Sequence, residues 1–511
     1  MTDKNRYYVT TAISYPNGRP HVGHAYEVIA VDWLARFARL DGRDTYFLTG
    51  SDEHGLKIAQ AARNAGVEPK AFVDEMVQHF KEMDAQLDIS YDRFIRTTDP
   101  DHKATVQALW QRMVDAGDIY LGRYEGWYSV RDEAYYDESE LNVADDDTKL
   151  APTGTAVEWT VEESWFFRLS RFQEPLLKLY AERPEYVRPA SRLNEMRAFV
   201  ERGLKDLSIS RTSFDWGVPV PGSPDHVMYV WVDALTNYLT PSGWPAEGWE
   251  KLWPANLHVI GKDVVRFHGI YWPAFLMSAG LPLPGGVFGH GFVLHRGEKM
   301  SKSLGNIVEP GALVESFGVD PLRYYMLRAI QFGQDGEWSH EAIGRRINAD
   351  LANDLGNLAQ RTLSMIAKNC DGKVPPAGPA TDSDRALLAE LGGLLEECRV
   401  AHAAVRPDQA LDAIWARVSA TNLYLNDHAP WALRKTDPAR ADIVLYHAAE
   451  AVRQLALLVQ PAMPTSGAKL LDQLAIPQDA RNFSSWGTRL RSGTPLPASV
   501  GVFPRWVEPE S

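Results

Sequence analysis

The sequence predicts an α/β fold in which a parallel-sheet domain is interrupted by an inserted domain and followed by a helical domain. Strand, loop and helix patterns alternate twice within the first 67 residues. Residues 117–225 change to short strands and turns, and the pattern beyond residue 340 is helical almost throughout. A chain of 511 residues is also too long for one hydrophobic core, so we expect two to four domains.

The first strand and helix follow from composition and spacing. Residues 6–13 ("RYYVTTAI") are rich in β-branched and aromatic residues, which favours a strand, and residues 14–20 ("SYPNGRP") have turn chemistry. From Val22 to about Arg39 the chain has apolar residues at helical spacing, namely Ala25, Ile29, Trp33 and Phe37.

The next segment repeats this order. Residues 42–55 ("GRDTYFLTGSDEHG") predict a strand that ends at Thr49 and a polar loop, and residues 55–67 predict a helix. Such alternation is typical of a Rossmann-like parallel sheet, which binds ligands at the carboxyl ends of its strands.

The domain boundaries follow from changes of pattern along the chain. Buried strands at 226–235 ("HVMYVWVDAL") and 257–263 ("LHVIGKD") are expected to complete the sheet after the insertion. Residues 372–384 form a loop by composition, and the Gly-, Pro- and Ser-rich C-terminal stretch is expected to pack back as an irregular tail. We therefore expect the first half of the sheet domain, the insertion, the second half of the sheet domain, a region with a polar loop, and the helical domain over residues 1–116, 117–225, 226–290, 291–345 and 346–511.

Composition excludes several classes of protein. The net charge of −14 argues against a protein that coats nucleic acid non-specifically, although it permits a local basic groove. Two cysteines are too few for a disulfide framework or a cysteine-rich zinc site. No secretory signal and no apolar run long enough to span a bilayer is visible, so we expect a cytoplasmic protein without a membrane partner.

The stretch "HVGH" (21–24) lies at the predicted start of a helix. His21 and His24 fall on one face of its first turn, where free backbone N–H groups and the helix dipole favour phosphate. Gly23 would let a flat ring approach the backbone closely. The same histidines could instead be metal ligands, with Asp52 or His54 as further donors, or ordinary core and surface residues.

A second polar stretch, "RGEKMSKSLGN" (296–306), contains Lys299 and Lys302. These lysines could close over a triphosphate and neutralise leaving pyrophosphate, or they could belong to a solvated basic turn. Neither the "GxxxxGK" nor the "GxGxxG" pattern occurs at the expected place, which argues against P-loop and dinucleotide-binding folds.

Together the two stretches resemble the "HIGH" and "KMSKS" signatures of class I aminoacyl-tRNA synthetases, in that family's order and at long separation. Five further segments are similar to the methionyl-tRNA synthetases in particular: "AISYPNGRPHVGH", "TGSDEHG", "YVWVDALTNYL", "VIGKDVVRFHGIYWPAFL" and "NDHAPWALRK". The likeness runs from about residue 6 to beyond residue 430. It implies an enzyme that activates L-methionine with ATP to methionyl-adenylate and transfers the methionyl group to the 3′ end of tRNA(Met).

The resemblance also implies a methionine site. Ile13 would offer backbone contacts, Tyr15 would cover the substrate, and Asp52 would hold its α-ammonium group with Arg211 near that carboxylate. The side-chain pocket would be lined by Trp231, Ala234, Leu235, Tyr238, Phe267, His268 and Trp272. Leu235 departs from the family, which often has proline there. An aromatic slot with a phenol that donates to the thioether suits methionine, whose sulfur favours aromatic edges.

For ATP the resemblance implies His21, His24, Glu27, Asp263 near the ribose, and Lys302 on the phosphates. His21, His24, Lys299 and Lys302 would be the catalytic residues, and Mg²⁺ would accompany ATP through phosphate oxygens. Many relatives carry zinc knuckles in the insertion. The insertion here has no cysteine, so we expect a knuckle that folds on side-chain packing and ion pairs without zinc.

In the helical domain, Asn353, Asn357 and Arg361 share one face at a spacing of four residues. By itself this spacing is typical of the wet side of an amphipathic helix. The resemblance implies instead an anticodon-binding domain, where Asn357 and Arg361 contact anticodon bases and Trp431 stacks on one of them. Single-stranded bases are commonly recognised in this way.

Several alternatives remain open. Another class I enzyme, for leucine, isoleucine, valine or cysteine, would need a larger editing insertion or a zinc thiolate site. A non-catalytic tRNA-binding paralogue would have no use for a pyrophosphate clamp, and a small nucleotidyltransferase would need no long helical domain. Nothing in the sequence matches the appended dimerisation domain of some relatives, so we expect a monomer, and no DNA partner.

Overall fold

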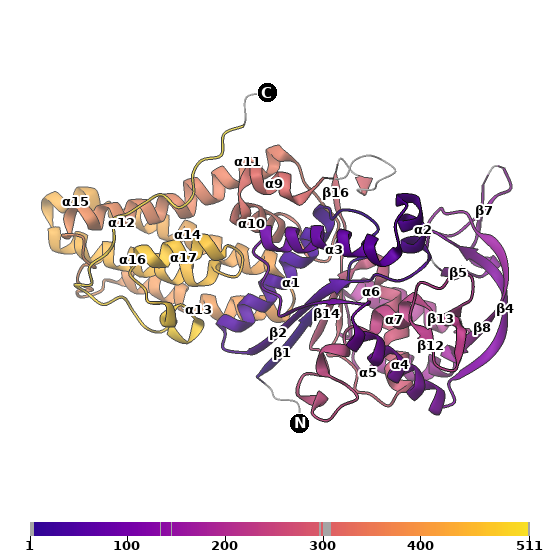
Figure 1. Ribbon diagram of the computed structural model, residues 1–511. Helices are drawn as coiled ribbons and strands as arrows, with labels where there is room; N and C mark the ends of the chain where they lie inside the picture. The colour runs from indigo at the N-terminus through magenta and orange to yellow at the C-terminus, as the bar shows by residue number, and fades with distance from the viewer. Residues whose placement is uncertain (1–4, 133, 145, 296–297, 300–307, 509–511) are drawn as a thin grey trace. The chain divides into compact units, whose positions relative to one another are not determined.

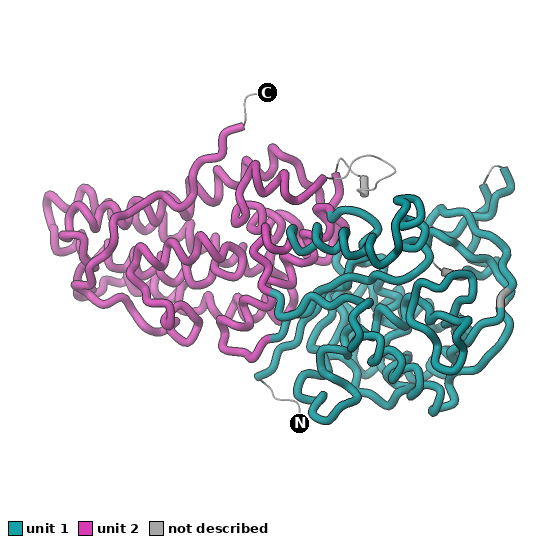
Figure 2. The backbone as a smooth tube through the Cα atoms, in the orientation of Figure 1, with its two compact units in different colours: residues 1–20, 46–83, 91–290 teal, residues 21–45, 84–90, 291–511 magenta. Residues whose placement is uncertain are grey.

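The computed structural model describes residues 5–132, 134–144, 146–295, 298–299 and 308–508 (Figure 1). The chain forms two compact units (Figure 2). Unit 1 comprises residues 1–20, 46–83 and 91–290, and unit 2 comprises residues 21–45, 84–90 and 291–511.

A six-stranded sheet organises unit 1, in the order β3-β2-β1-β14-β15-β9. Its strands are β1 (Arg6–Thr10), β2 (Asp44–Ser51), β3 (Arg93–Arg96), β9 (Val187–Arg188), β14 (Leu257–Gly261) and β15 (Val287–His290). The pairs β1–β14, β14–β15, β15–β9 and β2–β3 are all parallel, with Val9 opposite Leu257 and Thr49 opposite Phe94. The predicted parallel sheet is confirmed, as are the strands expected near residues 6–13, 42–49 and 257–263.

The end of β2 requires a glycine. Gly50 pairs with Ile95 of β3, and a Cβ atom on Gly50 would lie 2.0 Å from the Ile95 carbonyl oxygen. Only a residue without a side chain permits this approach. The polar loop after β2 therefore starts from a closely packed pair of strands.

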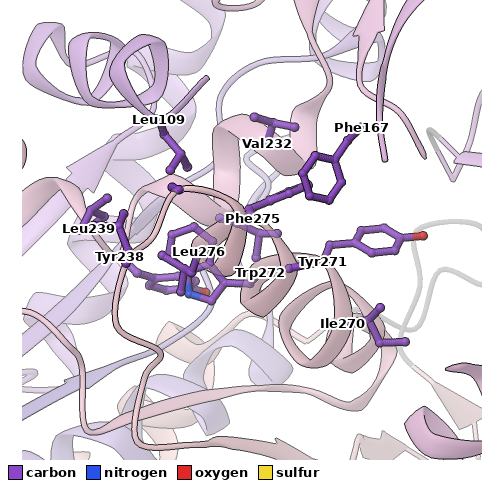
Figure 3. Packing of buried hydrophobic residues seen from close by; sticks show 14 of the residues in the cluster. Leu109, Phe167, Val232, Tyr238, Leu239, Ile270, Tyr271, Trp272, Phe275 and Leu276 are labelled. Carbon is purple, nitrogen blue, oxygen red and sulfur yellow. The ribbon is translucent and has the colours of Figure 1, made fainter. Parts of the chain in front are cut away.

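Helices pack around this sheet in unit 1. They are α2 (Leu56–Ala65), α3 (Pro69–Gln86), α4 (Pro100–Asp115), α5 (Gln173–Glu182), α6 (Ala190–Glu201), α7 (Val230–Thr236) and α8 (Trp272–Ser278), with a π-helical turn at Phe267–Tyr271. One buried apolar cluster joins the sheet to α4, α5, α6, α7 and α8, and Figure 3 shows part of it around Tyr238, Trp272 and Phe275.

The prediction of one strand over residues 226–235 is wrong. β13 (Ser223–Met228) ends early and pairs antiparallel with β11 (Ser210–Arg211) and β12 (Pro219–Val220), outside the six-stranded sheet. From Val230 the chain is the helix α7. A short apolar run cannot distinguish a buried strand from a buried helix, because both bury all of their side chains.

Antiparallel strands dominate the middle of the chain. β4 (Ile119–Ser129) and β8 (Glu158–Phe167) form a long hairpin-like pair, flanked by β5 (Ala134–Tyr136) and β10 (Leu207–Ser208). A small ladder joins β6 (Asn142–Val143) to β7 (Lys149–Leu150). The strands predicted here are confirmed, and two of them are longer than expected; the boundaries at 117 and 225 stay a prediction.

Unit 2 is mainly helical. Its helices are α1 (Val22–Leu40), α9 (Pro310–Phe317), α10 (Val319–Ala329), α11 (His340–Arg346), α12 (Asn357–Asn369), α13 (Asp382–Ala403), α14 (Pro407–His428), α15 (Pro430–Thr436), α16 (Pro438–Val459) and α17 (Pro464–Gln473). A π-helical segment, Ile347–Gly356, precedes α12, and β16 (Val293–His295) pairs with β17 (Glu298–Lys299) and β18 (Gly336–Glu337). The helical character predicted beyond residue 340 is confirmed.

The C-terminal tail packs back onto unit 2, as predicted. Lys373 forms an isolated β-bridge with Pro495, and the Trp506 indole donates to the Ser316 carbonyl at 3.2 Å. The loop expected over 372–384 ends slightly sooner, because Thr381 caps α13 and the helix begins at Asp382.

A buried arginine ties unit 2 together. Arg323 of α10 is fully buried and donates to the Asp32 carboxylate of α1 at 2.6 Å, and to the carbonyls of Leu87 and Ala462 at 3.0 Å. Burial alone would raise the pKa of Asp32, but Arg323 and Arg36 outweigh it and lower that pKa. The middle of α1 is thus held by a buried, paired charge.

Candidate active site

In unit 2, the two histidines of "HVGH" cap α1. His21 is the N-cap residue, and its Nδ1 accepts the Gly23 N–H at 3.1 Å; His24 Nδ1 accepts the His21 N–H at 3.1 Å. The prediction that both lie within the first turn is therefore wrong for His21, which precedes the helix. Because each Nδ1 accepts a backbone N–H, each neutral ring carries its proton on Nε2.

The two rings form a stack at the helix start. Their centroids lie 3.9 Å apart at 24°, and burial, followed by the neighbouring His21, holds the pKa of His24 well below its ordinary value. A Cβ at position 23 would lie 2.9 Å from Cε1 of His21, so a larger residue would displace this ring from its capping position. The His21 ring lies close to the Gly23 backbone, and the approach of a ligand ring at Gly23 stays a prediction. A neutral pair with Nε2 donors at a helix N-terminus can bind phosphate oxygens.

The structure describes only some of the other residues predicted to bind ATP. Glu27 lies on α1, one turn beyond the histidines, and Asp263 is an exposed residue of a short 3₁₀ turn after β14 in unit 1. Lys299 lies in β17, whereas Lys302 lies outside the described residues. Closure of the two lysines over a triphosphate stays a prediction.

In unit 1, Ile13, Tyr15 and Asp52 lie where β1 and β2 end. The Ser14 N–H donates to the Gly50 carbonyl at 2.9 Å, and the Asp52 N–H donates to the Ser14 carbonyl at 2.8 Å. These bonds continue the parallel pairing past β1 and bring the three predicted residues to the carboxyl edge of the sheet. This edge is where parallel sheets bind ligands.

The loop that holds Asp52 is rigidly anchored by its next residue. Glu53 is fully buried, and its carboxylate accepts hydrogen bonds from Arg96 Nε at 2.6 Å and from the hydroxyls of Ser51 and Thr98 at 2.5 and 2.6 Å. Its carbonyl accepts the Trp216 indole N–H at 2.6 Å. Asp52 itself is buried and belongs to this anchored loop at the sheet edge.

An aromatic wall forms the second part of the predicted methionine site. The Trp231 and Phe267 rings stack with centroids 3.8 Å apart at 7°, and His268 lies edge-on to Trp231 at 6.1 Å. Ala234, Leu235 and Trp272 are buried. The structure therefore brings together the predicted pocket residues of α7, of the turn Phe267–Tyr271 and of the start of α8. Residues that only filled the core would not need to lie together.

The Tyr238 hydroxyl is committed to His268. His268 Nδ1 donates to the Val264 carbonyl at 2.9 Å, and burial lowers the pKa of His268 to about 4, so the ring is neutral and its Nε2 is an acceptor. Tyr238 Oη lies 2.6 Å from that Nε2 and must donate to it. The donation to a thioether expected of Tyr238 therefore competes with this bond.

Arg211 is buried at the edge of the same region. Its Nη1 donates to the Ser210 carbonyl at 2.7 Å and to Ser208 Oγ at 3.0 Å, and its guanidinium lies 4.7 Å over the Tyr229 ring. Its predicted place beside the Asp52 carboxylate stays a prediction. A cavity of about 400 Å³ is lined by Arg211, Tyr229, Phe267 and residues that sequence reasoning missed, namely Phe199, Arg266 and Tyr271.

In unit 2, Asn357 and Trp431, predicted to read an anticodon, are exposed, and Arg361 is half-buried. The Arg361 guanidinium lies 4.9 Å over the Trp431 ring and donates to Asn426 Oδ1 at 3.0 Å, and Trp431 is 45% exposed. Asn353 and Asn357 line a cavity of about 580 Å³ whose other walls include Gln360, Phe503 and Arg505 of the tail. A flat aromatic surface, a guanidinium and amides suit unstacked bases.

The knuckle of the insertion is closed by hydroxyl groups rather than by ion pairs alone. The Asp132 carboxylate accepts hydrogen bonds from Thr153, from Thr155 at 2.7 Å and from Tyr136 at 3.0 Å. Burial alone would raise the pKa of Asp132, but these donors outweigh it and lower that pKa. In the part of the chain that the structure describes, no cluster of three metal-ligating side chains occurs, and no helix is long and apolar enough to cross a membrane.

Family models match most of the chain. Residues 7–363 match the model described as tRNA synthetases class I (M), and residues 374–502 match that of the anticodon binding domain of methionyl tRNA ligase.

Individual relatives are similar over full length. The methionine–tRNA ligase of Rhizobium meliloti is 57% identical and covers 100% of both chains, and that of Brucella suis is 57% identical over 99% of both. The structure of Mycobacterium tuberculosis methionyl-tRNA synthetase in complex with methionyl-adenylate is 56% identical, has a TM-score of 0.96, and matches 99% of this chain and 100% of that one. The free form of that enzyme gives a TM-score of 0.90 at 52% identity, over 99% of both chains.

Proposed function

The chain belongs to the methionyl-tRNA synthetase family of class I, and from this premise we propose that it is a methionine–tRNA ligase. It activates L-methionine with ATP to methionyl-adenylate and then charges tRNA(Met), for translation initiation and elongation. The observation that carries the proposal is the capped start of α1, where His21 and His24 present Nε2 donors at a positive helix end. That arrangement suits phosphate and leaves no ring lone pair on Nδ1 for a metal.

In the first step, a carboxylate oxygen of methionine attacks the α-phosphorus of ATP, and the bond from that phosphorus to the bridging oxygen breaks as pyrophosphate leaves. His21 and His24 donate to the phosphate oxygens as negative charge develops, and Lys299 and Lys302 neutralise the leaving group. No side chain needs to form a covalent intermediate, because positioning and electrostatics supply the rate.

In the second step, a hydroxyl of the terminal ribose of tRNA attacks the methionyl carbonyl carbon. The bond from that carbon to the adenylate oxygen breaks, AMP leaves with the shared electron pair, and the attacking hydroxyl releases its proton. Asn357, Arg361 and Trp431 would hold anticodon bases by amide contacts, guanidinium contacts and stacking. Stacking alone is tolerant of base identity, so the polar contacts would supply discrimination.

The methionine pocket combines a charge with an apolar slot. Asp52 would pair with the α-ammonium group, Ile13 and Tyr15 would lie against the substrate, and the stacked Trp231 and Phe267 rings would face its side chain. An apolar slot distinguishes substrates that differ by one methylene by only about 1–3 kcal/mol. Homocysteine should therefore be activated to some extent.

Mg²⁺ would bind ATP through phosphate oxygens and neutralise their charge. We further propose that the knuckle holds no zinc, since Asp132 already accepts three hydroxyl donors and the insertion has no cysteine. The enzyme is proposed to act as a cytoplasmic monomer without a DNA partner.

Exchange of labelled pyrophosphate into ATP, scanned over all twenty amino acids, tests the proposal. Exchange that peaks with methionine is the expected result. A peak with leucine, isoleucine, valine or cysteine would reassign the enzyme within its class, and tRNA binding without any exchange would favour a non-catalytic adaptor.

A further inference from the structure

We propose that Asp233 is a positioning residue that couples the loop of Asp52 to the aromatic wall of the amino-acid pocket, acting through His54 and His102. The proposal rests on the proposed function, because it concerns how the methionine site is held. None of these three residues was expected to touch the substrate.

The three side chains form a buried cluster within unit 1. Asp233 lies on α7 and is 1% exposed. Its Oδ2 lies 2.6 Å from His54 Nδ1, and its Oδ1 lies 2.7 Å from His102 Nε2. His54 and His102 are 2% and 0% exposed, so both oxygens of one buried carboxylate are paired with imidazoles from different elements.

The charge of Asp233 fixes how the imidazoles are protonated. Burial alone would raise the pKa of Asp233, but His54 and His102 outweigh it and lower that pKa to about 2. A carboxylate only accepts hydrogen bonds, so His54 must carry a proton on Nδ1 and His102 on Nε2. The other nitrogen of His102, Nδ1, lies 3.0 Å from the Thr240 hydroxyl, which fixes the plane of that ring.

The His54 ring has little else to hold it. Its Nε2 is buried without a hydrogen-bond partner among the described residues, and its ring packs edge-on against Trp216 at 5.3 Å. The Asp233 carboxylate is therefore the polar contact that sets the orientation of His54. Because His54 follows Asp52 by two residues, this contact limits how far the Asp52 loop can move away from α7.

Asp233, at the other end of its contact with His54, lies on the helix that carries part of the pocket wall. Trp231, Ala234 and Leu235 are on the same short helix as Asp233, and Tyr238 lies just after its C-cap residue. His102 holds this helix to α4 (Pro100–Asp115), while Glu53 holds the loop to β3 through Arg96. A displacement of Asp233 would change the gap between the α-ammonium site and the aromatic wall, and so affect methionine more than ATP.

Matched amide substitutions test the coupling. An asparagine amide N–H can replace Nδ1–H of histidine, and a glutamine amide N–H can replace Nε2–H, because the chain lengths match. His54→Asn and His102→Gln should therefore keep their bonds to Asp233, whereas His54→Gln and His102→Asn should lose them. Comparison within each pair avoids reliance on Asp233→Leu, which could simply fail to fold.

The readout is the KM for methionine and for ATP in pyrophosphate exchange, with kcat and the thermal midpoint measured alongside. We expect the methionine KM of the mismatched variants to be about tenfold or more above that of the matched ones, because they lose a hydrogen bond to a charged group. The ATP KM should be unchanged. Equal behaviour within both pairs, or losses confined to kcat and thermal midpoint, would overturn the coupling.

The wild-type control separates this inference from the proposed function. If the wild-type enzyme activates a different amino acid, the proposed function fails, and the same KM comparison with that amino acid still decides the coupling. If the wild-type enzyme activates none, both fail.

Discussion

The hydrogen bond from Tyr238 to His268 makes a sharp prediction for Tyr238→Phe. The substitution keeps the ring and removes only the hydroxyl. Because His268 is neutral with its proton committed to the Val264 carbonyl, its Nε2 would be left as a buried acceptor without its donor. An unsatisfied buried acceptor costs about 1–3 kcal/mol, and we expect the free energy of unfolding to fall by that amount.

The effect on substrate distinguishes two roles of the phenol. If Tyr238 acts by holding His268, its loss disturbs the pocket wall, and kcat/KM falls by the same factor for methionine and for norleucine, in which a methylene replaces the sulfur. If Tyr238 donates to the thioether, methionine loses an interaction that norleucine never had. We expect the first outcome, with the ratio of the two kcat/KM values changed by less than about twofold.

Pyrophosphate exchange with both amino acids measures this ratio, and urea denaturation measures the stability. His268→Gln is the control, since a glutamine carbonyl can still accept from the phenol, and it should be less damaging than His268→Leu. If the Tyr238→Phe enzyme keeps wild-type stability and loses activity toward methionine alone, the conclusion that the Tyr238 hydroxyl donates to a neutral His268 is refuted.

Four other predictions concern the lysine loop, the proposed tRNA site, the buried Arg323 and the knuckle. Lys302→Ala should slow adenylate formation far more than it weakens methionine binding; stopped-flow traces with an unchanged forward step would contradict the clamp. Trp431→Ala should lower kcat/KM for tRNA about tenfold, as for one lost base stack, and leave pyrophosphate exchange intact; equal losses in both would mean a structural role. Arg323→Met should destabilise unit 2 by about 3–5 kcal/mol in urea denaturation, because it leaves Asp32 buried without its main partner; the double variant with Asp32→Leu should recover part of this, and no recovery would place the cost in the lost carbonyl contacts. Treatment with a zinc chelator followed by excess Mg²⁺ should leave thermal midpoint and exchange unchanged; a lower midpoint with bound zinc by mass spectrometry would show that the knuckle needs metal despite the donors on Asp132.

Local signals in the sequence were enough to predict the strands and the helix whose ends carry predicted site residues. The strand at β1, the helix α1 and the strand β2 are confirmed near their predicted bounds, because alternation and helical spacing depend only on neighbouring residues. The position of "HVGH" at a helix start was also predicted from neighbouring residues alone. The detail that His21 caps the helix rather than entering it depends on one backbone turn, which a motif does not specify.

The run at 226–235 shows where local signals fail. Its apolar residues are buried except for the half-buried Trp231, so periodicity could not separate β13 from α7. Asp233, a charged residue inside that run, was a signal that a buried partner must exist, because an unpaired buried carboxylate is costly. Nothing nearby in the sequence could identify the partner.

The sequence by itself determined which residue types the site contains, while their tautomers and pairings were decided by packing between distant segments. His54 and His102 meet Asp233 across separations of 179 and 131 residues, and Tyr238 meets His268 across 30. Whether a phenol donates to a ring nitrogen, or an imidazole to a carboxylate, depends on which acceptor the fold buries beside it. That choice is made by the packing of α7, α4 and the Asp52 loop against the sheet, and no local pattern encodes it.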